Sequence, residues 1–186
     1  MSREPGDGEG QGSGKRKRAR APRPSPSQLS PQEAHDRARD AALRLLSHRE
    51  RSRTELRSRL ARKGFDARTI DRVLDSLSES GLQSDERFAE AFALQARVGR
   101  GLSSYALQGE LRRRGVDKVL AAEAATESPE EEERRARTLA VRRAARLAGL
   151  PEDVRNRRLM SYLARRGYPS ELCARLVAET AENPVP

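Results

Sequence analysis

The 186-residue sequence contains one cysteine, Cys173, no tryptophan, and only 3% aromatic residues. A single cysteine excludes an intrachain disulfide and supplies too few thiolates for a metal site, so a reducing cytoplasm is the expected compartment. With so few aromatic side chains, stacking on nucleic acid bases is not expected to be a main mode of binding. No apolar run approaches the ~18 residues that span a bilayer, and the N-terminus lacks the apolar stretch of a secretory signal. No membrane association is therefore expected.

Side chains suited to catalysis are also scarce. The two histidines, His35 and His48, are thirteen residues apart, a spacing that matches no metal motif. No Ser/His/Asp grouping, phosphate-binding glycine loop or pair of inward carboxylates stands out. The acidic run over 130–133 fits the first turn of a helix, where carboxylates offset the helix dipole. The sequence thus predicts a protein that is not an enzyme and has no metal or other cofactor.

The alternation and β-branched enrichment of strands are missing too, which argues against a β-sheet. Hydrophobic residues make up 35% of the chain and charged residues another 35%, so any apolar core must be thin. A thin core suits small stacked helical units better than one large globule, because each unit needs to cover only its neighbours. We therefore predict an all-α fold.

Three glycines, Gly64, Gly115 and Gly167, recur about 50 residues apart, and each closes the same kind of segment. A basic pair comes just before each glycine, and a larger apolar residue follows it. A fixed period of this length indicates one structural unit used three times, which favours an extended binding surface over a single catalytic site. Leucine occurs eight and four residues before each glycine, at Leu56 and Leu60, Leu107 and Leu111, and Leu159 and Leu163.

Helix start signals divide the chain into a tail and three three-helix units. Ser30, Ser52 and Ser128 are each followed three residues later by Glu, the pattern of a capping box. The first residues are rich in Gly, Ser, Pro and charge without apolar periodicity, which predicts a disordered tail. The predicted divisions are the tail over 1–29 and the units over 30–81, 82–127 and 128–186.

The few aromatic residues are assigned mostly to core positions in these units. In the second unit, the first helix is expected to turn Ala91 and Gln95 inward together with its two phenylalanines. The aromatic residues assigned in this way are Phe65, Phe88, Phe92, Tyr105 and Tyr168.

The net charge is +10 and the isoelectric point is near 10.8, so the chain is expected to attract polyanions such as nucleic acid or an acidic protein. Nearly all of this charge is arginine, and alanine is abundant, as a G+C-rich genome would also produce. Charge alone therefore leaves the partner open among nucleic acid, an acidic protein and an anionic membrane.

The basic pairs before the three glycines are candidates for partner binding. With the leucine four residues before the glycine facing inward, a residue two positions further on points roughly 200° away, toward solvent. Arg62, Arg113 and Arg165 should therefore project from equivalent places on the three units. An alternative is that these cations only stabilise helix C-termini, by ~0.3–1 kcal/mol each. The pairs are Arg62 and Lys63, Arg113 and Arg114, and Arg165 and Arg166.

Several segments resemble the RecX family of bacterial recombination regulators over about residues 33–182. The most specific is Asp85-Glu86-Arg87-Phe88-Ala89-Glu90, which with Arg97 and Gly101 is similar to the second repeat of that family. The segments over 42–65 and 163–168 resemble the first and third repeats. One departure is Leu102-Ser103-Ser104, which stands where the family usually has a Gly-Pro turn, so the entry angle of the second unit is open.

The resemblance implies an elongated, curved, all-helical protein that binds the RecA filament on single-stranded DNA. It implies inhibition of the RecA ATPase, of strand exchange and of filament growth by a monomer that contacts more than one RecA protomer. Weak contacts to DNA phosphates are expected beside the protein contacts. An autonomous DNA-binding protein built from helix-turn-helix-like units is the alternative. The candidate partner-binding residues are Arg62, Lys63, Arg97, Arg113, Arg114, Arg165 and Arg166.

Overall fold

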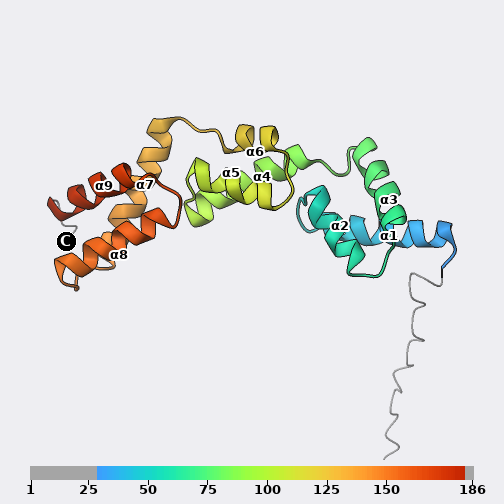
Figure 1. Cartoon of the computed structure of the whole chain (residues 1–186), viewed down its shortest axis with the longest axis horizontal. Helices are drawn as coiled ribbons and strands as arrows, with labels where there is room; N and C mark the ends of the chain where they lie inside the picture. Colours follow the sequence, from blue (N-terminus) through green and yellow to red (C-terminus); the bar gives the residue numbers. More distant parts are fainter. Residues whose placement is uncertain (1–28, 183–186) are drawn as a thin grey trace, which may run out of the picture.

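The computed structural model describes residues 29–182, and within this range every regular element is an α-helix (Figure 1). The all-α prediction is thus confirmed for the described part of the chain. The predicted disordered tail over 1–29 lies, apart from its last residue, outside the described residues. The helices are α1 (Pro31–Leu46), α2 (Arg53–Ala61), α3 (Ala67–Glu79), α4 (Asp85–Arg100), α5 (Ser104–Arg113), α6 (Lys118–Ala125), α7 (Pro129–Ala145), α8 (Glu152–Ala164) and α9 (Ser170–Glu182).

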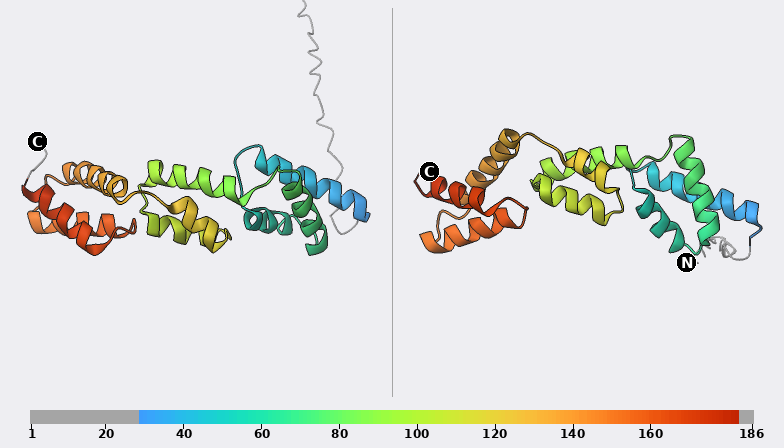
Figure 2. Two further views of the ribbon diagram at one scale, coloured as in Figure 1. Left: turned by 90° about the horizontal axis from the view of Figure 1, so that it is seen from above. Right: turned by 45° about the horizontal axis from the view of Figure 1, so that its top comes forward.

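Three hydrophobic cores lie one after another along the chain, built from α1–α3, α4–α6 and α7–α9. We call these helix triplets units 1, 2 and 3. They follow each other in line and form an elongated, gently arched array (Figures 1 and 2). The leucines predicted from the glycine period are all fully buried: Leu56, Leu60, Leu107, Leu111, Leu159 and Leu163.

The first helix of each unit packs through alanines, and the face predicted for the first helix of unit 2 needs correction. In α4, Ala91 and Gln95 are exposed, while Ala89, Ala93 and Ala96 are buried beside Phe88. The predicted inward face of this helix was therefore partly wrong. Small side chains let the other helices of a unit approach closely, which is how a chain with so few large apolar residues still packs a core. The corresponding alanines are Ala34, Ala38 and Ala42 in α1, and Ala136, Ala140 and Ala144 in α7.

The predicted capping boxes are only partly formed. Ser30 and Glu33 form both reciprocal hydrogen bonds, so this box is complete. At the start of α2, Ser52 accepts from the Glu55 amide at 3.1 Å, but the Glu55 carboxylate binds Arg49 at 2.8 Å. Ser128 likewise caps α7 through its own hydroxyl group. At α2, the Glu55 carboxylate therefore forms an ion pair with Arg49 instead of the hydrogen bond to the Ser52 amide that would complete the box.

Neighbouring units meet at two equivalent joints, where the start of one unit's second helix contacts the end of the next unit's second helix. In the first joint, the Ser52 hydroxyl donates to the Arg114 carbonyl at 2.7 Å. In the second joint, the Ser103 amide donates to the Arg166 carbonyl at 2.9 Å. The recurrence of this contact fixes a similar relation between successive units. It also gives Ser103 a structural role, although Leu102-Ser103-Ser104 departs from the expected turn.

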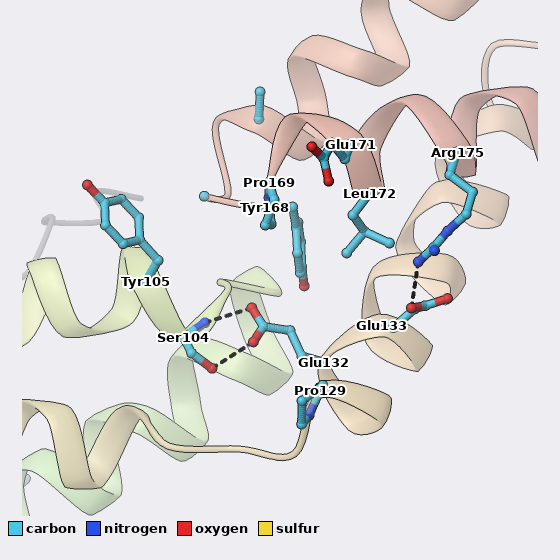
Figure 3. Close-up of a pocket in the computed structure, with 12 residues that line it drawn as sticks. Ser104, Tyr105, Pro129, Glu132, Glu133, Tyr168, Pro169, Glu171, Leu172 and Arg175 are labelled. Carbon is cyan, nitrogen blue, oxygen red and sulfur yellow. Dashed lines mark hydrogen bonds and ion pairs between the residues drawn. The ribbon is translucent and has the colours of Figure 1, made fainter.

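A carboxylate from the following unit completes each joint by capping the first backbone N–H of the preceding second helix. Asp85, at the start of α4, accepts from the Arg53 amide at 2.7 Å. Glu132, in the first turn of α7, accepts from the Ser104 amide at 3.0 Å and from its hydroxyl at 2.9 Å (Figure 3). Carboxylates at helix N-termini also benefit from the helix dipole, so these contacts stabilise the joints electrostatically.

Two of the periodic glycines are required at these joints for two reasons. Gly115 and Gly167 adopt φ values of +82° and +86°, which side chains with a Cβ rarely adopt. A Cβ on Gly115 would lie 2.0 Å from the Thr54 hydroxyl oxygen, and one on Gly167 would lie 2.5 Å from the Ser103 hydroxyl oxygen. Glycine therefore ends the helix and also lets the neighbouring unit approach.

Candidate partner-binding surface

The three arginines predicted to project alike are all exposed, at the C-terminal ends of α2, α5 and α8. Arg113 lines a shallow hollow of ≈240 Å³ together with Arg62, and a second hollow of ≈360 Å³ together with Arg165. Arg165 also lines a third hollow of ≈380 Å³. The three hollows thus follow one another across both joints. We call their arginines the basic track: Arg49, Arg59, Arg62, Arg112, Arg113, Arg114, Arg143, Arg157, Arg158 and Arg165.

Two carboxylates lie along the track, and both are engaged by arginines. Glu55 pairs with Arg49 at 2.8 Å, and Glu110 pairs with Arg100 at 2.8 Å. Burial alone would raise the pKa of Glu110, but the hydrogen bond and charge of Arg100, with further help from Arg114, hold this pKa below its ordinary value. Glu110 therefore stays ionised at neutral pH, and the arginines of the two hollows outnumber the two carboxylates.

Arg62 also serves its own helix, since its Nε donates to the Ser58 carbonyl of α2 at 3.3 Å. This bond is what the capping explanation predicts for a cation in the last turn. Because the Arg62 side chain is exposed, the two terminal nitrogens of its guanidinium group remain accessible to a partner. The capping and binding interpretations of Arg62 are therefore compatible.

The second member of each basic pair behaves differently from the first. The Arg114 guanidinium lies 4.4 Å from the centre of the Phe92 ring, and the Arg166 guanidinium lies 3.6 Å from that of Tyr162. Arg166 Nε also donates to the Arg100 carbonyl across the second joint at 2.9 Å. Lys63, the second member of the first pair, is exposed and makes no ion pair among residues 29–182. Within these residues no unit precedes unit 1, so Lys63 has no joint to contact. Arg114 Nε also lies 3.8 Å from the Glu55 carboxylate of the preceding unit, so Arg114 and Arg166 both help to hold the joints.

Arg97, near the end of α4, contacts the segment that connects units 2 and 3. Its Nη2 atom donates to the carbonyls of Ala124 and Thr126 at 3.3 and 3.0 Å, and its Nε is 3.7 Å from Glu127. Glu127 also pairs with Arg135, whose Nη2 atom donates to the Leu102 carbonyl at 3.2 Å. Sequence interpretation missed Glu127 and Arg135, because nothing in their local spacing links them to a residue about thirty positions earlier.

Burial affects the titratable groups of this connection in opposite ways. For Arg135, burial alone would lower the pKa, but the hydrogen bond and charge of Glu127 raise it above the ordinary value, so the guanidinium stays charged. Burial raises the pKa of Tyr168, whose hydroxyl donates to the Gly101 carbonyl at 3.1 Å. The connection is therefore a charged contact, and Arg97 is one of the three predicted partner-binding residues that are half-buried, with Arg114 and Arg166.

Tyr105 was assigned to the core, and this assignment was wrong. Its side chain is 79% exposed at the first turn of α5, where it lines the edge of a pocket that Glu132 and Tyr168 also line (Figure 3). It lines the second hollow together with Arg113 and Arg165. Its position one residue after the start of α5, beside the joint, keeps it out of both neighbouring cores.

In the described part of the chain, no group of three or more His, Cys, Asp or Glu side chains is placed to hold a metal ion. None of the described helices is both long and apolar enough to cross a bilayer.

The joints and the basic track define a class, the tandem helical-repeat proteins whose successive units present one extended surface. Three models of one protein family match the chain: "RecX, first three-helix domain" over residues 38–77, "RecX, second three-helix domain" over 84–124 and "RecX, third three-helix domain" over 130–177. The chain belongs to the RecX family.

Curated relatives and solved structures agree with this assignment. The chain is 41% identical over 154 residues to "Regulatory protein RecX" of Amycolatopsis mediterranei (strain U-32), covering 82% of this chain and 88% of the relative. It is 44% identical over 154 residues to "Regulatory protein RecX" of Thermobifida fusca (strain YX), covering 82% and 83%. The crystal structure of RecX from Lactobacillus salivarius superimposes with a TM-score of 0.67 at 18% identity, covering 81% of this chain and 99% of that one. At that identity, the structural likeness supports the fold.

Proposed function

We propose that this protein binds the RecA filament on single-stranded DNA and mainly inhibits its ATPase, its recombinase activity and its growth. Membership of the RecX family, whose relatives carry the name regulatory protein, supports a regulatory role. The proposed action is by binding rather than by catalysis. It is the action of a monomer in the cytoplasm, where the recombinase and its DNA are found.

The observation that carries the proposal is the recurrence of the basic track across both joints. Arg62, Arg113 and Arg165 are exposed at the same helix end in three units, and neighbouring members share a hollow. A partner that repeats an acidic group along its own axis could engage them together, and linked contacts of this kind strengthen one another. A protein filament repeats its surface groups along its axis, and a filament on nucleic acid also carries the negative charge of the phosphates. One molecule would then block several protomers, so inhibition should need less than one molecule per RecA.

The structure divides the predicted partner-binding residues by accessibility. Arg62, Lys63, Arg113 and Arg165 are exposed and are proposed to contact the filament directly. The remaining three are occupied within the chain and are proposed to act by holding the units in register: Arg97, Arg114 and Arg166.

The test is the RecA ATPase on single-stranded DNA, measured against increasing amounts of this protein. Reversing the three charges with Arg62→Glu, Arg113→Glu and Arg165→Glu should raise the concentration for half-inhibition by about 10- to 100-fold, since each lost contact counts for ~0.5–1 kcal/mol. If the three residues act only as caps, the cost is stability, up to about 1 kcal/mol per site. Melting temperature and inhibition are therefore measured on the same proteins.

A matched control carries the same change of charge on other faces. Arg68, Lys118 and Arg146 are exposed, one in each unit, and line none of the three hollows. Their triple replacement by Glu should leave inhibition close to that of the unchanged protein. Equal inhibition by the two folded triple variants would place the filament contact elsewhere. Binding of naked DNA with no effect on RecA would instead favour the autonomous DNA-binding alternative.

A further inference from the structure

The third hollow of the basic track differs from the other two in having no acidic lining residue. It is lined by Arg143 of α7 and by Arg157, Arg158, Ser161 and Arg165 of α8. Among residues 29–182, none of these four arginines pairs with a carboxylate. In contrast, Glu55 and Glu110 line the first and second hollows. The chain thus collects four guanidinium groups around one cavity and supplies no counterion for them.

The sequence of α8 places these side chains on one face. Arg157, Ser161 and Arg165 follow one another at a spacing of four residues, and Arg158 is three residues before Ser161. Arg143 reaches the same cavity from the last turn of α7. Gathering like charges in this way raises the electrostatic energy of the unoccupied protein, and an anion in the cavity would relieve it.

Arg143 adds a buried donor at the edge of the same cavity. Its Nε atom is buried without a hydrogen-bond partner, as are the Nε atoms of Arg97 and Arg135 elsewhere among residues 29–182, but of the three only Arg143 lines this hollow. Buried donors are almost always satisfied, because an unpaired one loses its hydration without compensation. The Arg143 guanidinium lies 5.2 Å from the centre of the Tyr162 ring, whose other neighbour is Arg166. The side chain is therefore held beside the cavity with a donor to spare.

We infer that this hollow binds the phosphodiester groups of single-stranded nucleic acid. Guanidinium groups offer planar pairs of donors that match two phosphate oxygens, and the Ser161 hydroxyl adds a further donor. The hollow of ≈380 Å³ lies next to the second one, since Arg165 lines both. A linear series of cationic hollows suits a linear polyanion better than a free phosphate ion. The assignment rests on the proposed function in one respect: the strand is the DNA carried by the filament.

Tyr105 is the reason for choosing a single strand over a duplex. It is 79% exposed and lines the second hollow beside Arg165. Proteins that hold single strands combine a basic groove with aromatic rings on which unpaired bases stack, and a duplex does not offer such bases. One exposed ring next to the phosphate-binding arginines gives a place for one base of the strand. A single ring reads no sequence, so binding should be independent of sequence.

The experiment measures binding of a fluorescent oligothymidylate to the full chain by anisotropy, without RecA, over a series of salt concentrations. Arg157→Gln with Arg158→Gln removes two phosphate contacts, so the slope of log affinity against log salt should flatten by about 1.4. At about 0.1 M salt the same loss corresponds to roughly 25-fold weaker binding. The matched control is Arg68→Gln with Arg72→Gln, two exposed arginines on α3 at the opposite end of the array (Figure 1).

The outcomes separate this inference from the proposed function. An α8 double variant with the same affinity and salt slope as the α3 control overturns the hollow as a phosphate site, even if the protein inhibits RecA. Loss of oligothymidylate binding in the α8 variant alone supports the hollow, even if RecA is unaffected. Competition by ATP well below the concentration of oligonucleotide phosphate would overturn the assignment to a strand. Tyr105→Leu should weaken single-strand binding by about 5-fold or more and spare a duplex; equal effects on both would overturn the single-strand choice.

Discussion

Replacing Gly115 by alanine tests whether the joint between units 1 and 2 sets both stability and regulatory activity. The left-handed backbone at this position costs an alanine ~1–2 kcal/mol. The new Cβ would also lie 2.0 Å from the Thr54 hydroxyl oxygen and 2.4 Å from its Cβ. The Thr54 hydroxyl can rotate away, but its Cβ is fixed to the backbone, so unit 1 itself has to shift. Overpacking of this kind costs ~1–3 kcal/mol, so the total loss should be about 2–5 kcal/mol.

Gly81→Ala is the matched control for this loss. Gly81 also has a positive φ, +67°, but an added Cβ there would meet nothing within 4 Å. This variant therefore carries the backbone cost of ~1–2 kcal/mol without the steric clash. The difference between the two free energies of unfolding, measured with denaturant, isolates the contact across the joint. The m-value must be compared as well, because units of a repeat protein can unfold separately.

The same pair of variants tests the function. A shifted joint changes the spacing between Arg62 and Arg113, although both side chains remain in place. Gly115→Ala should therefore inhibit the RecA ATPase more weakly than Gly81→Ala at equal folded concentration. If the two variants are equally stable and inhibit equally well, the reasoning about the joint is refuted.

Two further predictions concern individual charges. Arg166→Ala should lower the free energy of unfolding, measured with denaturant, by about 1–2 kcal/mol, because it removes the contact with Tyr162 and the hydrogen bond across the second joint. Lys63→Ala, the control, should change this free energy by less than about 0.5 kcal/mol. The pKa of Glu110 is lower in the folded protein than in the unfolded chain, so the unfolded chain binds more protons as the pH falls. The stability from Glu110 should therefore be complete at neutral pH and decline as the pH falls below about 4.3, and an acid titration of Glu110→Gln should show a smaller decline than that of the unchanged protein.

Local signals in the sequence were enough to predict the helices and the repeat. The buried leucines at minus eight and minus four were confirmed in all three units, because helical periodicity requires only that one face be apolar. The positive φ of the closing glycines follows from the same local geometry. The face of α4 was harder to predict, since alanine is common on both buried and exposed helix surfaces. Phe92 lies at the edge of the core, where Arg100 and Arg114 contact its ring.

Contacts between units could not be predicted from local signals, and they decide what each arginine does. Adjacent residues of a basic pair point in directions about 100° apart on a helix. Arg113 consequently reaches the surface, while Arg114 turns to the Phe92 ring and toward Glu55 of the preceding unit. The pattern that repeats in the sequence is the pair, but the joint assigns its two members to different tasks. Within residues 29–182 no unit precedes unit 1, so Lys63 has no joint to hold there, and a lysine stands in place of the arginine found in the other two units. Arg114 and Arg166 instead place a planar guanidinium group over the Phe92 and Tyr162 rings, a contact that the ammonium group of a lysine cannot make in the same way, so an arginine fits these two joints.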